Sequence, residues 1–151
     1  MYRASVDGFS SNEFHSRCDG IGNTLTVIKA ENENIFGGFT EAKWSSKAEY
    51  TTNHNSFIYS LINKDKKSFK VMNSLNGAHS IYSKSDYGPT FGGGHDFYIA
   101  SDSNSNLKSY SNLGHTFKHQ DYPNNTEKAK SILAGSYNFK TIEIEVFTKI
   151  I

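Results

Sequence analysis

The glycine-rich stretch YGPTFGGGHDFYIA, residues 87–100, contains the residue types of a catalytic or ligand-binding turn. A phosphate-binding loop would need a helix after it, because the N–H groups of a helix N-terminus hold the phosphate. Here a strand-like apolar run follows, and no G-K-[ST] sequence supplies a lysine for the phosphate. We therefore interpret the stretch as a bend in the backbone, with His95 and Asp96 at its exposed end.

The glycines themselves support that interpretation. Pro89 disfavours the helical region for the residue before it, and glycine permits positive φ and a close approach of the backbone. We predict a structural turn that uses Gly88, Gly92, Gly93 and Gly94. At least one of the three consecutive glycines is expected to have positive φ, and Gly93 is the one expected to need that freedom.

Two further patterns resemble metal-binding sequences but are incomplete. His115 and His119 have the spacing of a zinc-binding pair, yet this spacing puts both on one face only in a helix, and the segment has the pattern of a loop or strand. Asp102, Asn104 and Asn106 begin like a calcium loop, but the turn glycine and the bidentate glutamate are missing. The sequence predicts no bound metal and no cofactor.

Cys18 is the single cysteine and the strongest candidate nucleophile. Ser10 and Glu13 form a capping box at the start of a predicted helix that ends near Gly20. Phe14 and Cys18 are four residues apart on that helix, so both are expected on its inward face. A buried cysteine is not accessible to a substrate, so Cys18 is not expected to be a catalytic residue. No catalytic residue is therefore predicted, and the chain is not expected to be an enzyme. A weak enzyme, or a redox- or metal-dependent sensor that uses Cys18 or the His95/Asp96 corner, remains the alternative.

Alternating and β-branched runs indicate that strands dominate the rest of the chain. The pair Asn76-Gly77 predicts a hairpin between its flanking runs, and the glycines of IFGGFT predict a bulge. A second helix is expected at residues 126–133, capped by Thr126 and stopped by Gly135. The expected fold is mainly β (α+β), with two antiparallel sheets packed as a β-sandwich and one or two short flanking helices. The expected strands are residues 24–30, 35–40, 56–62, 96–100 and 138–147, with those of the hairpin.

Length and charge bound the function. The 151 residues suit a single domain, and 16 basic against 15 acidic residues give a net charge of +1. Nucleic-acid binding needs a concentrated basic face, so no nucleic-acid partner is expected. No apolar run approaches the ~20 residues of a membrane span, so no membrane insertion is expected. The absence of a disulfide framework and of an apolar leader favours an intracellular, cytoplasmic location.

Seven motifs in order resemble the TLDc domain, and the resemblance covers residues 2–147, so residues 1–151 are expected to form one TLDc-like domain. The motifs are YRASVDGFSSNEFHSRCDG, TLTVIKA, IFGGFTEAKW, FIYSL, GPTFGGGHDFYIA, SNLGHTF and AGSYNFKTIEIEVF. The resemblance implies a sandwich of two antiparallel sheets with short helices. It also implies a role in protection from oxidative stress and in regulation of the vacuolar proton ATPase, whose peripheral sector is the implied partner. No catalytic mechanism is established for the family.

The family motif FGGGGE matches FGGGHD here, so that His95 stands in place of a glycine and Asp96 in place of a longer acidic residue. The family motif GTGE matches NHNS, residues 53–56, where the acidic residue is missing. The long Ser/Asn loop is similar to TLDc domains at the end of large protist and invertebrate proteins. A larger multidomain parent protein is therefore one expectation.

Together these observations predict a non-catalytic protein-interaction module that binds its partner through a loop-rich edge and not through a deep pocket. The predicted partner-binding residues are His95 and Asp96 at the glycine turn, with Asp102, Asn104 and Asn106 in the polar loop at residues 102–112. In an alternative interpretation, Asp96 is structural and accepts hydrogen bonds from backbone N–H groups of the turn.

Overall fold

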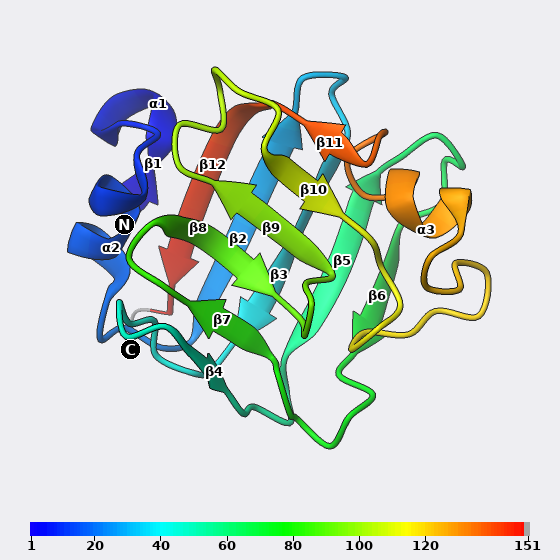
Figure 1. Cartoon of the computed structure of the whole chain (residues 1–151), viewed down its shortest axis with the longest axis horizontal. Helices are drawn as coiled ribbons and strands as arrows, with labels where there is room; N and C mark the ends of the chain where they lie inside the picture. The colour runs from blue at the N-terminus through cyan, green and yellow to red at the C-terminus, as the bar shows by residue number, and fades with distance from the viewer. Residues whose placement is uncertain (150–151) are drawn as a thin grey trace.

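The chain folds into two six-stranded antiparallel sheets that pack face to face, as the sequence predicts (Figure 1). The computed structural model describes residues 1–149. The first sheet has the strand order β1-β12-β2-β3-β5-β6, and the second has the order β11-β10-β9-β8-β7-β4. The strands are β1 (Tyr2–Arg3), β2 (Thr24–Ala30), β3 (Ile35–Thr40), β4 (Glu49–Thr51), β5 (Phe57–Ile62), β6 (Phe69–Met72), β7 (Ile81–Ser83), β8 (Tyr87–Phe91), β9 (Phe97–Ala100), β10 (Ser109–Ser111), β11 (Asn138–Phe139) and β12 (Thr141–Thr148).

Three short helices lie at the margins of the sandwich: α1 (Ala4–Asp7), α2 (Ser11–Cys18) and α3 (Glu127–Ser131). Figure 1 shows α1 and α2 on one side and α3 on the opposite side. The hydroxyl of Ser10 accepts the N–H of Glu13 at 3.2 Å, which confirms the predicted N-cap of α2. Thr126 caps α3 in the same way, through the N–H of Ala129.

Aromatic rings from both sheets fill the space between them. Phe36 of the first sheet meets Phe97 of the second edge to face, with ring centroids 5.3 Å apart. Phe91 stacks on Phe97 at 5.0 Å, and Trp44 packs edge-on against Phe91 at 5.8 Å. All four side chains are almost fully buried. Such ring pairs stabilise a core beyond the area that they bury.

The glycines of β3 serve close packing and do not form the predicted bulge. The pairing of β2 with β3 has no register shift, and the shift between β3 and β5 lies at Ile35 and Phe36, before the glycines. A Cβ on Gly38 would meet the ring of Phe91 from the other sheet, and a Cβ on Gly37 would meet the Tyr59 hydroxyl. The residues are glycine because neighbouring groups occupy the space of a side chain.

The hairpin predicted at Asn76-Gly77 is wrong. β6 pairs with β5 in the first sheet, whereas β7 pairs with β4 and β8 in the second. Asn76 and Gly77 do have positive φ, at 51° and 82°, so the local turn signal is correct. The chain uses this turn to cross between the sheets, and the side chain of Asn73 holds it by accepting the N–H groups of Leu75 and Gly77.

Candidate functional site

The glycine turn joins β8 to β9 and has positive φ at Gly92 and Gly94, at 90° and 80°. The expectation of positive φ in this turn is therefore confirmed, but it falls on the two glycines that flank Gly93. A Cβ on Gly92 would collide with the carboxylate of Asp96, whereas a Cβ on Gly94 would meet nothing within 4 Å. A Cβ on Gly88 would lie 2.9 Å from the backbone oxygen of Ile99. The turn needs glycine for two reasons, its dihedral angles and the space that its neighbours occupy.

Asp96 points into the protein and is fully buried. Its carboxylate accepts the backbone N–H groups of Gly114 at 3.1 Å, Thr116 at 3.2 Å and Phe117 at 3.0 Å. These donors come from the loop that follows β10, so one side chain ties two loops together. The structural interpretation of Asp96 describes this geometry, although the donors lie in another loop and not in the glycine turn. The side chain is not available to a partner.

Burial raises the pKa of Asp96 to about 7, because a charged carboxylate loses its hydration inside the protein. The backbone N–H groups of residues 114–117 act in the opposite direction, since they favour the ionised form. No charged side chain contributes to the shift. The carboxyl group therefore responds to pH through its burial and its backbone donors.

His95, the next residue back, points the other way and lies among tyrosine rings. The ring centroids of five tyrosines lie within 6.4 Å of the His95 centroid, the nearest being Tyr82 at 5.1 Å. Its Nδ1 lies 2.9 Å from the backbone oxygen of Gly92, to which it can donate a hydrogen bond. Burial lowers the pKa of His95, which favours the neutral form of the ring.

Six tyrosines form a continuous row across the outer face of the second sheet, and we call this set the tyrosine row. Consecutive ring centroids along the row are 4.7, 5.4, 4.5, 5.3 and 5.4 Å apart. The two end rings are 40% and 42% exposed, and the four between them are partly buried. Ammonium groups of Lys84 and Lys130 lie over Tyr87 and Tyr137. In order, the row contains Tyr50, Tyr82, Tyr87, Tyr98, Tyr110 and Tyr137.

The sequence pattern of the TLDc domain family matches residues 1–149 of the chain. The chain belongs to the TLDc domain family. No curated protein matches it. In this TLDc domain, the glycine turn precedes His95, which lies among the tyrosine rings, and Asp96, which is buried.

The other predicted contact residues lie at the far end of β9 from His95. Asp102 and Asn104 are exposed in the loop that follows Ala100, the last residue of β9. Asn106 closes this loop by donating from its amide to the backbone oxygens of Ser101 and Asp102, both at 3.0 Å. The strand β9 separates the two groups of residues, so the TLDc fold does not bring the predicted surface together.

The predicted burial of Cys18 is confirmed, since its side chain is 0% exposed. Burial, together with the nearby Asp19, raises the pKa of the thiol to about 12. Thiolates, and not thiols, are the reactive form of cysteine. His115 and His119 do not meet, because His119 packs against Phe69 and Tyr122 while His115 faces a different pocket. Within residues 1–149, no group of three His, Cys, Asp or Glu side chains is placed to hold a metal ion.

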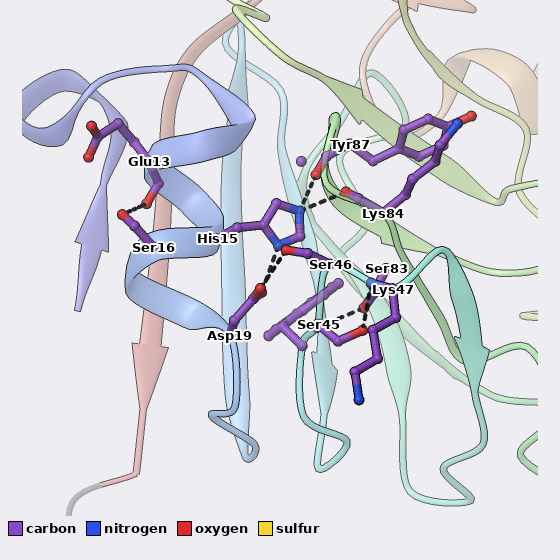
Figure 2. A network of polar contacts seen from close by, with 12 residues as sticks. Glu13, His15, Ser16, Asp19, Ser45, Ser46, Lys47, Ser83, Lys84 and Tyr87 are labelled. Atoms are coloured by element: carbon purple, nitrogen blue, oxygen red, sulfur yellow. Dashed lines mark hydrogen bonds and ion pairs between the residues drawn. The ribbon is translucent and has the colours of Figure 1, made fainter.

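His15 is a buried polar residue that the sequence analysis missed (Figure 2). Its Nε2 lies 2.7 Å from the backbone oxygen of Lys84 and 2.8 Å from that of Tyr87, and its Nδ1 lies 2.6 Å from Oδ1 of Asp19. All three partners are hydrogen-bond acceptors. Figure 2 shows how this ring links α2 to Lys84, ahead of β8, and to Tyr87, the first residue of β8. The His-x-x-x-Asp spacing on a predicted helix was the available signal.

Proposed function

We propose that this TLDc domain is a non-catalytic protein-interaction module that binds its partner through the tyrosine row and His95. The observation that carries the proposal is the unbroken contact of six tyrosine rings across one exposed sheet face. Tyrosine provides a large, rigid and amphipathic contact area and loses little conformational entropy on binding. It is enriched in protein interfaces for these reasons.

The phenol groups of the tyrosine row and two nearby lysines can also form polar contacts with a partner. Burial raises the pKa of Tyr110 to about 12, and burial raises that of Tyr98 as well. These two phenol groups therefore stay protonated and can both donate and accept hydrogen bonds with a partner. Lys84 and Lys130, above two of the rings, add positive charge at the margins of the face.

In its finer form, the proposal names the peripheral sector of the vacuolar proton ATPase as the partner and protection from oxidative stress as the cellular role. Both rest on the TLDc family membership. The loop with Asp102, Asn104 and Asn106 is proposed as a second, weaker contact, since it is polar and exposed. None of the helices within the described residues is long and apolar enough to cross a membrane.

The experiment measures binding of the purified peripheral sector to the wild-type domain and to a Tyr98→Ser/Tyr110→Ser variant. The matched control is Phe147→Ser, which removes a 46% exposed aromatic ring from the first sheet. We expect at least a tenfold rise in Kd for the tyrosine variant, about 1.4 kcal/mol, and no change for the control. Equal losses in both variants would show that the tyrosine row is not the contact surface. Absence of wild-type binding would exclude this partner.

A further inference from the structure

A polar pocket opens beside one end of the tyrosine row, where the glycine turn meets the loops after β10 and before α3. Its volume is about 340 Å³. Gly93 and Gly94 form part of its wall, together with three histidines, three asparagines and one tyrosine. The side chains that line the pocket include His79, His115, Asn112, Asn124, Asn125 and Tyr50.

Some hydrogen-bonding groups in the walls of this pocket have no hydrogen-bond partner within residues 1–149. Asn112 and Asn125 pair through side-chain amides at 3.0 Å, which fixes both side chains and leaves Nδ2 of Asn125 without a partner. Nδ1 of His115 contacts Oγ1 of Thr116 at 3.0 Å, and its Nε2 has no partner. Neither ring nitrogen of His79 is hydrogen-bonded. The amide and imidazole groups supply donors and acceptors side by side.

The lining of the pocket contains no Lys, Arg, Asp or Glu side chain. A phosphate or carboxylate ligand would need a cation or a helix N-terminus. A single-stranded nucleic acid would need a positively charged groove beside its stacking rings. A bound metal is also disfavoured, because none of the described residues form a group of three metal-ligating side chains. An uncharged ligand with many hydrogen-bonding groups fits what is left.

An aromatic ring stands at the rim of the pocket. Tyr50, 40% exposed, packs edge-on against His79 with centroids 4.4 Å apart, and its hydroxyl accepts the N–H of Gly94 at 3.3 Å. These contacts hold the ring in place and leave part of its surface open. An aromatic ring next to amide groups matches a sugar, which has an apolar C–H face and hydroxyls that both donate and accept.

We propose that this pocket binds an uncharged saccharide unit, with its C–H face against Tyr50 and its hydroxyls on His115 and Asn125. The pocket shares Tyr50 with the tyrosine row and is also lined by His95. Binding of a sugar in the pocket does not require that the row binds a protein. The sugar can be free or the terminal unit of a glycan, since both present the same hydroxyls and the same ring face.

The test is a titration of the isotope-labelled domain with neutral monosaccharides and their methyl glycosides, followed by amide chemical shifts. The probes are glucose, galactose, mannose and N-acetylglucosamine. We expect saturable shifts at Gly93, Gly94, His115 and Asn125 with at least one probe, with a Kd of about 1 mM. Binding of the free sugar alone indicates a free ligand, and equal binding of the methyl glycoside indicates a glycan unit.

Variants distinguish this pocket from the rest of the surface. His115→Ala with Asn125→Gly should weaken binding about tenfold or more, and glycine suits position 125 because its φ is 70°. Tyr137→Ala at the far end of the tyrosine row is the control and should leave sugar binding unchanged. No saturable shift at these four residues with any probe would overturn the proposal, as would equal binding by the double variant. Tighter binding of glucose 6-phosphate than of glucose would overturn the uncharged class of ligand.

Discussion

The carboxylate of Asp96 accepts the backbone N–H of Phe117 at 3.0 Å, and both residues are fully buried. The Asp96 carboxylate therefore holds the loop after β10 against the glycine turn. The same turn places His95 beside the tyrosine row. Two consecutive residues therefore point in opposite directions, with Asp96 directed into the protein and His95 directed toward the tyrosine rings. Asp96 holds two loops together inside the protein, and the proposed recognition uses the face around His95.

Replacing Asp96 should destabilise the domain. In Asp96→Ala, three backbone N–H groups lose their acceptor inside the protein, and each unsatisfied buried donor costs about 1–3 kcal/mol. We expect the free energy of unfolding to fall by at least about 3 kcal/mol in urea denaturation. Asp121→Ala, at an exposed position without positive φ, is the control and should change it by less than about 0.5 kcal/mol. An Asp96→Ala protein as stable as the wild type would contradict this assignment.

Asp96 should make the free energy of unfolding depend on pH. Its folded pKa, about 7, lies above the ordinary value of 3.8, so the folded state holds the proton more tightly than the unfolded state. This contribution is fully present below pH 3.8 and is lost as pH rises to about 7. The slope it contributes is at most about 1.4 kcal/mol per pH unit. Urea denaturation of Asp96→Asn between pH 4 and pH 8 should show this falling component removed. An unchanged pH profile in the variant would count against the burial effect.

The sequence predicted much of the local structure. The bounds of β2 and β3 are those expected, because β-branched and aromatic residues mark them, and Ser10 caps α2 as its capping box indicates. The sequence did not predict that the chain crosses between the sheets at Asn76-Gly77. The dihedral preferences of these two residues indicate a turn, but they do not indicate which strand will pair with the strand that follows it. The tyrosine row was missed because it depends on the strand order, which brings Tyr50, Tyr82, Tyr87, Tyr98 and Tyr110 of five strands side by side, with Tyr137 just before β11. Burial of Asp96 depends on donors some twenty residues away, which no local pattern reveals.

Two glycines of the turn form a matched pair. Gly92→Ala and Gly94→Ala place the same side chain at similar positive φ, so the backbone cost is common to both, about 1 kcal/mol. Only the Cβ at position 92 collides with Asp96. We expect Gly92→Ala to lower the unfolding free energy by about 1–3 kcal/mol more than Gly94→Ala, measured by urea denaturation. Equal losses would show that conformation alone requires glycine here.

The thiol of Cys18 should react slowly in the native protein. Its side chain is fully buried and its pKa is raised to about 12, so neither access nor thiolate formation favours attack. A chromogenic thiol reagent at pH 8 should label the denatured protein rapidly and the native protein at least about a hundredfold more slowly. Labelling at equal rates would restore the redox-sensor alternative.

The most direct measurement of the central claim is hydroxyl-radical footprinting of the domain alone and in complex with the vacuolar ATPase peripheral sector. Side-chain oxidation, read by mass spectrometry, reports which exposed rings the partner covers. The account predicts protection of Tyr50, Tyr98, Tyr110 and Tyr137, with Phe147 on the opposite sheet oxidised equally in both samples. Protection of Phe147 with unchanged oxidation of the four tyrosines would contradict the account, because the partner would then lie on the first sheet.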